Sequence, residues 1–445
     1  MFAPVRDGQI EALRAFLAGC CAPGAPGHAD LANPDINFAA LPMLHNIRAF
    51  IGEDPSLGDR AFHPRSLNTL FGHGAWPVER VSLGLLGCCD GSVDAFLVAL
   101  AAQCDGWLAA LFMHCEGFGA GDDVLAFMRG HVVKSLASYV NGPGRTVVAV
   151  HENAALLTAL RAARGATVGY DPAATARQLA AVVDVPLTPP APTTAGYAFA
   201  SLLHLLSVPA AVLALVSLLV WLALRYPWLF VLVLVAATVK LWWLRHIEST
   251  DPLVVVPPDP ADIAARSAFE DHDSANPFTA IGTIKPGLFR MGLVRVIHYV
   301  IDWGARHLFR SGRLGRVGTI HFARWVLIDG GRRVIFTSEY DGSAEAYMDD
   351  FINKVGFGLN VSFTNGIGYP RTRWLILDGA SDEQRFKYFM RHHQIVTQFW
   401  WRAYPGQTTF DLARAARVRA GYVKLCAGED LDELAAARWL AEIAA

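Results

Sequence analysis

Two histidines, two arginines and one aspartate in the last third of the chain are the residues best suited to chemistry. His321 and Arg324 share one β-rich run, Asp341 ends the next run, and Arg391 and His393 lie in a helical segment. An arginine beside a histidine can polarise a bound peroxide, and a second histidine can ligate haem iron. These five residues are therefore the candidate catalytic set, and peroxidase-like oxidoreduction is the chemistry they predict.

Residues of the same types recur in the same order nearer the N-terminus. His45 and Arg48 share the HxxR spacing of the later pair, and Asp90 begins a second Asp-Gly-Ser sequence. The run FMRGH, which ends at His131, likewise answers FMRHH, which ends at His393. Pro143-Gly144 answers Pro405-Gly406 in turn, and four such clusters in one order predict a duplicated domain. His45, Asp90 and His131 are accordingly the candidate cofactor-binding residues of the first copy.

Retention of these residues in both copies also favours a second interpretation. A lone active site needs its residues only once, whereas groups that stabilise a repeated fold are needed twice. The histidines and arginines would then tie strand to helix, or one copy to the other, through buried hydrogen bonds and ion pairs. The Asp-Gly-Ser sequence would in turn cap the helix that follows it.

The peroxidase expectation also rests on a resemblance. The run from Gly87 to Gly91, GCCDG, resembles the GxxDG motif of dye-decolorising peroxidases. Two ferredoxin-like units in one chain resemble the dimeric α+β barrel superfamily, which includes these peroxidases and chlorite dismutases, both haem enzymes. The motif aspartate of that family assists peroxide cleavage, which implies this role for Asp90 or Asp341. The second copy departs from the motif, because Ser338 stands where the motif has glycine.

A second resemblance covers the chain from about Asn276 through Arg419. This part resembles a family of bacterial membrane-anchored proteins that carry a similar series of KPG, HFARW, FTSxxDGS and GxP sequences after a hydrophobic segment. The resemblance implies a bacterial membrane protein and lends no particular activity.

The elements that must position the candidate residues follow an α+β pattern. Two β-rich runs, IHFARWVLID and VIFTSEYDGS, flank a turn and are followed by a helix from Ser343 to Val355. We then expect strands at Leu359–Phe363 and Arg373–Leu377 and a helix from Asp382 to about Tyr404. This order predicts a ferredoxin-like α+β sandwich. On a regular strand, His321 and Arg324 would face opposite sides.

Near the middle of the chain lies a long apolar stretch. The run from Ala198 to Leu224 contains no Asp, Glu, Lys or Arg, and a second run from Trp228 to Leu244 follows a three-residue turn. A helix needs about 20 apolar residues to cross a bilayer. We expect a transmembrane helical hairpin, with a re-entrant hairpin or a buried soluble one as alternatives. Because Met1–Gly19 lacks the apolar core of a signal peptide, the globular parts should face the cytoplasm at the bacterial inner membrane.

Proline-rich stretches before and after the apolar hairpin suggest where the chain divides into domains. Between Lys285 and Arg316 seven Lys and Arg residues face one acid, which predicts a basic amphipathic helix on an anionic leaflet or on the second domain. The expected divisions are a first α+β repeat at 1–185, a linker at 186–196, the hairpin at 197–245, a linker with the amphipathic helix at 246–316, and a second α+β repeat at 317–445.

Composition limits the classes of partner. Hydrophobic residues make up 53% of the chain and charged residues 18%, and the formal net charge is −2. This balance favours lipid contact and gives no sign of nucleic-acid binding. Seven cysteines without a CxxC pair predict reduced thiols. We expect the bilayer and a lipophilic small molecule as partners and leave a homodimer open. The two functions predicted are a peroxidase-like, haem-dependent oxidoreductase and a non-catalytic membrane-bound binding or assembly module.

Overall fold

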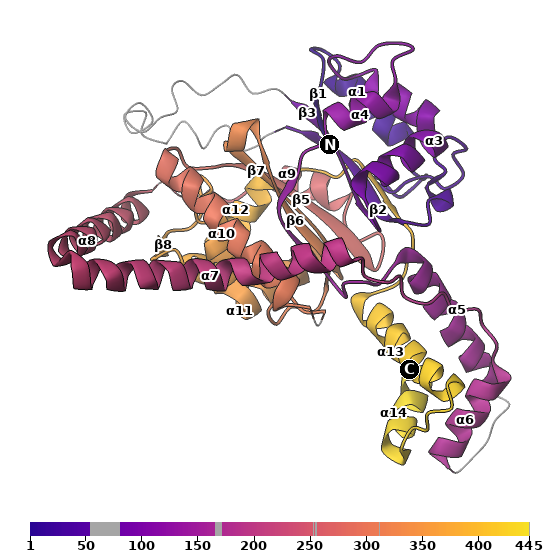
Figure 1. Ribbon diagram of the computed structural model, residues 1–445. Coiled ribbons are helices and arrows are strands. Elements are labelled where there is room, and N and C mark those ends of the chain that lie inside the picture. The colour runs from indigo at the N-terminus through magenta and orange to yellow at the C-terminus, as the bar shows by residue number, and fades with distance from the viewer. Residues whose placement is uncertain (54–80, 165–170, 252, 254–255, 311, 445) are drawn as a thin grey trace.

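The computed structural model describes residues 1–53, 81–164, 171–251, 253, 256–310 and 312–444. This part of the chain is a mixed α+β protein with two antiparallel sheets at its centre (Figure 1). A long helical hairpin projects from one side of this body, and a group of four helices extends from another. The predicted α+β class is therefore confirmed.

Each sheet has four strands and takes one of them from the other half of the chain. The first sheet has the order β1-β3-β2-β10 and the second has the order β4-β6-β7-β5. In β10, Trp400 lies opposite Arg48 of β2, and in β4, Ser138 lies opposite Arg324 of β6. The exchanged strands interlock the two halves. Their bounds are β1 (Phe2–Pro4), β2 (Leu44–Gly52), β3 (Ser82–Cys89), β4 (Ser135–Val140), β5 (Ala275–Thr283), β6 (Ile320–Ile328), β7 (Arg333–Asp341) and β10 (Phe399–Arg402).

The two sheets face each other, and helices cover their outer faces. A small apolar cluster between the sheets joins Phe50 and Leu86 to Ile281, Val326 and Ile335. Larger apolar cores lie on the outer faces, because alternate residues of a strand point to opposite sides. The first sheet is covered by α1 (Ile10–Gly19), α3 (Val93–Phe112) and α4 (Val124–Gly130), and the second by α10 (Leu288–His307), α11 (Ala344–Phe363) and α12 (Glu383–His393).

A separate apolar core holds the group of four helices together. Leu156 and Leu160 pack there with Val418, Trp439 and Ile443. The group combines helices from both halves of the chain and extends away from the sheets (Figure 1). Its members are α5 (Val147–Arg164), α6 (Pro172–Val182), α13 (Thr409–Cys426) and α14 (Glu433–Ala444).

The main elements follow one order in both halves. The first half reads β1-α1-β2-β3-α3-α4-β4-α5, and the second reads β5-α10-β6-β7-α11-α12-β10-α13. Local details agree as well. The helices α3 and α11 begin at the capping residues Ser92 and Ser343 and leave helical geometry at one interior residue each, Cys104 and Val355. Matched positions therefore carry matched backbone features.

Three predicted elements were wrong. Residues Leu359–Phe363 are not a strand but the last turns of α11, because Leu359 and Phe363 bury one face of that helix. The strand expected at Arg373–Leu377 is reduced to the short strands β8 (Thr372–Arg373) and β9 (Leu377–Asp378). The last predicted helix ends at His393, because the chain turns extended at Gln394 and then enters the first sheet as β10.

The stretch predicted as one basic amphipathic helix also differs. Strand β5 precedes it, and α10 covers only its middle part. Lys285 and Arg290 are buried rather than exposed, and both pair with the Asp251 carboxylate, at 2.7 and 2.8 Å. Burial lowers the pKa of Lys285 to about 8. These two cations therefore hold α10 to the end of the hairpin and do not face a leaflet.

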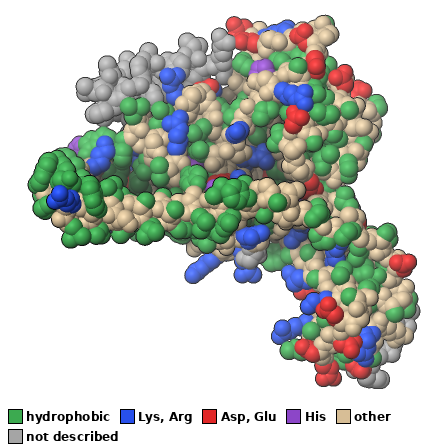
Figure 2. All heavy atoms as spheres, in the orientation of Figure 1, with side chains coloured by type: hydrophobic (Ala, Val, Ile, Leu, Met, Phe, Trp, Pro, Cys, Tyr) green, Lys and Arg blue, Asp and Glu red, His purple; other side chains and the backbone are tan. Residues whose placement is uncertain are grey.

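Three described helices are long and apolar enough to cross a membrane: α3, α7 (Ala195–Arg225) and α8 (Pro227–Thr250). The apolar window of α3 is 44% buried inside the protein, whereas that of α7 is 0% buried and that of α8 is 6% buried. Hydrophobic side chains consequently cover the projecting hairpin (Figure 2). This composition indicates membrane association, and α7 and α8 are the helices left free to provide it.

Candidate functional site

His321 and Asp341 form a hydrogen-bonded pair at the end of the second sheet. His321 Nε2 lies 2.6 Å from Asp341 Oδ1. The other oxygen, Asp341 Oδ2, accepts hydrogen bonds from the Thr409 amide at 2.8 Å and the Thr409 hydroxyl at 2.6 Å. Burial lowers the pKa of His321, against the opposing effect of the Asp341 hydrogen bond. The pair thus joins β6 and β7 to the first residue of α13.

His45 and Asp90 form the corresponding pair in the first half. His45 Nε2 lies 3.1 Å from Asp90 Oδ1, and His45 Nδ1 lies 2.8 Å from the Tyr404 hydroxyl. Asp90 Oδ2 accepts a hydrogen bond from the Val147 amide, at the start of α5, at 2.9 Å. Both ring nitrogens of His45 are therefore engaged, and both pairs connect the end of a sheet to the start of a helix.

A β-bulge changes the direction of the histidine in each half. The strand registers shift at His45 and at His321, so these strands are not regular there. The His45 ring consequently lies 5.4 Å from the Phe322 ring of the facing sheet, and Arg48 also reaches that sheet. The histidine and arginine of an HxxR run were expected to face opposite sides, which is true of a regular strand. The bulge adds a residue between the two side chains' positions in the pleat, so both face the same side and the expectation was wrong here.

The arginines Arg48 and Arg324 cross from one sheet to the other. Arg48 donates to the Phe278 carbonyl at 2.7 Å and pairs with the Glu339 carboxylate, while Arg324 donates to the Gly87 carbonyl at 3.2 Å. Burial raises the pKa of Glu339 in spite of Arg48. The space left beside these arginines is about 10 Å³, which is about one water molecule.

Arg391 and His393 lie elsewhere, on α12. Arg391 pairs with Glu270 at 2.7 Å and with Glu345 at 3.1 Å. The His393 ring contacts the Phe389 ring, with 4.1 Å between the ring centroids, and His393 Nδ1 lies 2.7 Å from the Phe389 carbonyl oxygen. The first half repeats both arrangements, in the ion pair of Arg129 with Asp94 and in the ring contact of His131 with Phe127.

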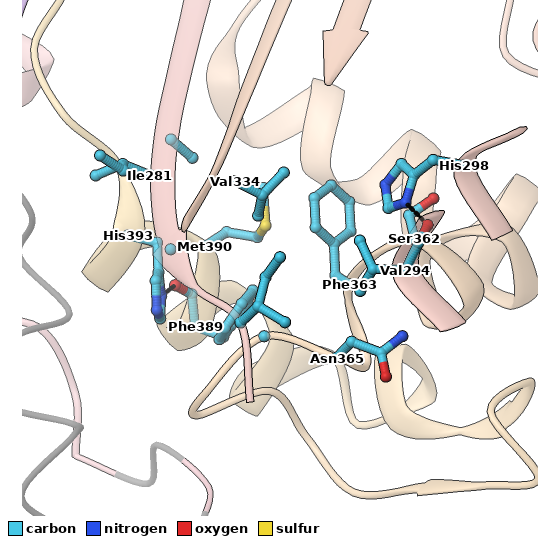
Figure 3. A pocket seen from close by; sticks show the side chains of 14 residues that line it. Ile281, Val294, His298, Val334, Ser362, Phe363, Asn365, Phe389, Met390 and His393 are labelled. Atoms are coloured by element: carbon cyan, nitrogen blue, oxygen red, sulfur yellow. Dashed lines mark hydrogen bonds between the residues drawn. The ribbon is translucent and has the colours of Figure 1, made fainter. Parts of the chain in front are cut away.

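A narrow apolar pocket separates His393 from His298 (Figure 3). None of the other four predicted catalytic residues lines it. His298 Nε2 has no hydrogen-bond partner among the described residues, and burial lowers the pKa of His298 to about 4. The pocket holds about 30 Å³, against roughly 300 Å³ or more for a typical ligand pocket. Haem does not fit there.

The predicted catalytic residues are therefore divided among several separate places. His321 and Asp341 connect strands to α13, and Arg324 spans the two sheets. Arg391 pairs with acids beside α12, and His393 lines the narrow pocket. The structure unites the His321–Asp341 pair but does not bring the five residues to one cavity.

A much larger cleft, about 550 Å³, lies where α7 meets α10. This volume falls within the usual range for ligand pockets, about 300–1,000 Å³. Its walls come from the first turns of α7, the last turns of α10 and the segment around β4. The lining residues are Ser138, Val140, Pro143, Tyr197, Ala200, Ser201, His204, Asp302, Ala305, Arg306, His307 and Arg310.

Charged and polar side chains cross-link the two helices at this cleft. His204 Nδ1 of α7 lies 2.9 Å from His307 Nε2 of α10. Asp302 pairs with Arg306 at 2.6 Å and accepts a hydrogen bond from the Ser138 amide at 3.0 Å. The pKa of His307 is lowered, first by burial and then by its neighbours His204, Arg310 and Arg306.

The helix α10 connects the bases of both hairpin helices. The Trp303 indole of α10 donates a hydrogen bond to the Leu205 carbonyl of α7 at 2.9 Å. The Tyr299 hydroxyl of α10 donates one to the Ser207 hydroxyl of α7 at 2.7 Å. At the other end of α10, its Phe289 ring packs 5.3 Å from Trp243 of α8. The cleft therefore lies where the hairpin leaves the globular body.

The spacing of the candidate residues gave no indication of this cleft. Its one available signal was His204, the only ionisable residue in the apolar run from Ala198 to Leu224. An ionisable side chain inside such a run is expensive in lipid and usually marks a functional position. Its partners Asp302 and His307 lie about 100 residues further on, and no local pattern connects them to it.

Comparisons with known proteins add no functional assignment. A scan against family models, a search of curated proteins and a search of solved structures each found no match to this chain. Among the described residues, no group of three or more His, Cys, Asp or Glu side chains is placed to hold a metal ion. The cleft and the hairpin are the features that bear on function.

Proposed function

We propose that this protein is a membrane-anchored, non-catalytic binding module that holds its ligand in the cleft between α7 and α10. One observation carries the proposal. A cavity of about 550 Å³ lies at the base of an apolar, almost wholly exposed helical hairpin. A ligand held there would be within reach of the bilayer surface, and an amphiphilic molecule fits a site lined by both apolar and charged side chains.

The two interlocked α+β units are, in this proposal, duplicated ferredoxin-like copies that serve as a scaffold. The shared element order, the two bulges and the two His–Asp pairs at helix starts support the duplication. Because His45 and His321 make equivalent contacts in both units, a structural role accounts for their presence. The presence of both His–Asp pairs is then explained by structure alone, without an active site.

The haem-dependent oxidoreductase has less support. The His–Asp pairs are engaged in structural hydrogen bonds, and the spaces beside Arg324 and His393 are about 10 and 30 Å³. Titration of the purified protein with haemin tests this comparison directly. We expect no saturable Soret band, and a stoichiometric one would favour the oxidoreductase instead.

We place the hairpin across the cytoplasmic membrane, with both globular units on the cytoplasmic side. Exposed apolar residues of α10, among them Val296 and Val300, would then contact the leaflet next to the exposed Arg295 and Arg306. From His204 to Arg225, α7 advances by 21 residues (225 minus 204). This corresponds to about 32 Å of helix length, close to the thickness of the hydrocarbon core.

Blocking the cleft tests the binding function. Ala200 lines the cleft, and Ala200→Trp would fill part of it. Val212, also on α7, is 57% exposed and does not line the cleft, so Val212→Trp is the matched control. Each full-length protein is purified in mild detergent, and bound amphiphiles are extracted and identified by mass spectrometry.

We expect a bound amphiphile in the wild type and in Val212→Trp, and its loss from Ala200→Trp. A wild-type protein that carries no amphiphile, or an Ala200→Trp variant that carries as much as the control, would contradict the proposal.

A further inference from the structure

The ionisable groups that face the cleft leave a surplus of positive charge. Its lining has two arginines and two histidines but a single acid, Asp302. Asp302 is 8% exposed, pairs with Arg306 and accepts a hydrogen bond from the Ser138 amide. Arg310 forms no ion pair with any residue that the structure describes. The cleft therefore offers an anion one uncompensated guanidinium, that of Arg310, beside the half-exposed Arg306 that pairs with Asp302.

The geometry of Arg306 and Arg310 suits one kind of anion. Arg306 lies in the last turn of α10, Arg310 follows three residues after the end of that helix, and both line the cleft. Arg306 contacts Asp302 through Nε, and its side chain is 56% exposed. Guanidinium groups bind phosphate through paired hydrogen bonds, and two of them can share one phosphate.

The rest of the cleft supplies an apolar surface. Ala200, Ala305, Val140 and Pro143 line it together with the Tyr197 ring. Beyond the cleft, α7 continues as an exposed apolar helix, with Leu205 39% and Leu206 51% exposed. A ligand whose charged end meets the arginines can therefore lay an acyl chain along α7.

We infer that the cleft binds a phosphate-bearing amphiphile, with Arg310 and Arg306 on the phosphate and α7 along the apolar chain. This inference rests on the function proposed above and adds the chemical class of the ligand. The shared chemistry is a phosphate joined to an apolar chain. A headgroup of the surrounding bilayer and a soluble phosphate compound are separate sources of it, which the test must distinguish.

The test uses the full-length protein in an uncharged maltoside detergent, with isothermal titration calorimetry as the readout. Three probes are compared: dihexanoyl phosphatidic acid, dihexanoyl glycerol with the same chains but no phosphate, and inorganic phosphate. We expect saturable binding of the phosphatidic acid, weaker binding of the glyceride and none of inorganic phosphate at the same concentrations.

Variants assign the phosphate contact. Arg310→Gln should weaken phosphatidic acid binding about tenfold, because it removes a charge-assisted hydrogen bond. Arg313→Gln is the matched control, since Arg313 is exposed on the same segment but does not line the cleft. Binding of the uncharged glyceride should be the same in both variants, and an unchanged unfolding midpoint would show that both remain folded.

Each alternative result has its own meaning. Equal affinity for the glyceride and the phosphatidic acid, or an unchanged affinity in Arg310→Gln, overturns the phosphate assignment and leaves the binding function in place. Inorganic phosphate that binds as tightly as the phosphatidic acid overturns the amphiphile assignment. If neither lipid probe binds, or if Ala200→Trp binds both as well as the wild type, the proposed function itself fails.

Discussion

At the scale of single residues, the histidines and aspartates that looked catalytic serve as connections between strands and helices. Asp341 illustrates this, because it accepts three hydrogen bonds, one from His321 and two from Thr409. Its partner His321 is 3% exposed. A buried carboxylate with this many partners stabilises the place where β7 meets α13.

Replacement of this carboxylate should therefore reduce stability. An amide in Asp341→Asn retains one acceptor oxygen and leaves a buried donor unmatched, so we expect a loss of roughly 1–3 kcal/mol in the free energy of unfolding. Asp350→Asn is the control, because Asp350 pairs with Lys354 near the surface. Chemical denaturation in detergent measures both. Equal stability of Asp341→Asn and the control would argue against the structural role.

His298 should give the protein a measurable dependence on pH. Its pKa is lowered from 6.5 to about 4 by burial, so between these values the unfolded chain binds a proton that the folded chain does not. Stability should thus fall as pH drops from 6.5 to 4, by roughly 3 kcal/mol from this group. His298→Phe should remove that part of the slope, since the pocket beside it has room. His151→Gln, at an exposed position, should leave the slope unchanged.

At the scale of elements, the contact between α8 and the β8–β9 segment fixes one end of the hairpin. Glu248 of α8 is 2% exposed and accepts hydrogen bonds from the Trp374 amide at 3.0 Å and the Leu375 amide at 2.7 Å. Trp374 and Leu375 have positive φ values of 58° and 67°, a backbone conformation that residues other than glycine rarely adopt. The carboxylate therefore holds a strained segment against the hairpin.

Loss of Glu248 should release this segment. In Glu248→Ala the two amides lose their acceptor, so we expect trypsin to cut after Arg373 several times faster than in the wild type. Glu383→Ala is the control, because within the described part of the chain Glu383 forms only an ion pair with Lys387, at an exposed position. The rates are read from fragment masses over time. A rate equal to the control would mean that Glu248 does not hold the segment.

At the scale of the whole molecule, the hairpin decides how the protein is arranged at a membrane. The hairpin tip carries Arg225, Tyr226 and Trp228, and the Arg225 guanidinium lies 5.7 Å from the Tyr226 ring. Such side chains favour a membrane interface over the hydrocarbon core. Both ends of the hairpin return to one body, so a full crossing places the tip alone on the far side.

Cysteine labelling distinguishes a full crossing from a re-entrant hairpin. Cys426 is exposed on α13 and serves as the internal marker of the globular side. In intact cells, a membrane-impermeant maleimide should label Tyr226→Cys and leave Cys426 unlabelled. After the cells are opened, both should react. Labelling of neither cysteine in intact cells would indicate that the hairpin is re-entrant.

The sequence by itself determined the features that follow from the local pattern of residue types along the chain. The length of the apolar run from Ala198 to Leu224 predicted a membrane-competent helix, and the ordered landmarks around His45 and His321 predicted residues that the structure places in matched contacts. Helix periodicity failed for Leu359–Phe363, because a short apolar run fits a buried strand as well as the buried face of a helix.

Only the tertiary structure decided which residues meet. The bulge at His321 turns its side chain to the side of Arg324, and strand β10 joins a sheet whose other members lie more than 300 residues earlier. The cleft likewise joins His204 to His307 across 103 residues. Contacts of this kind depend on how whole elements pack, because the free energy that selects them comes from burial shared among distant segments and leaves no local periodicity.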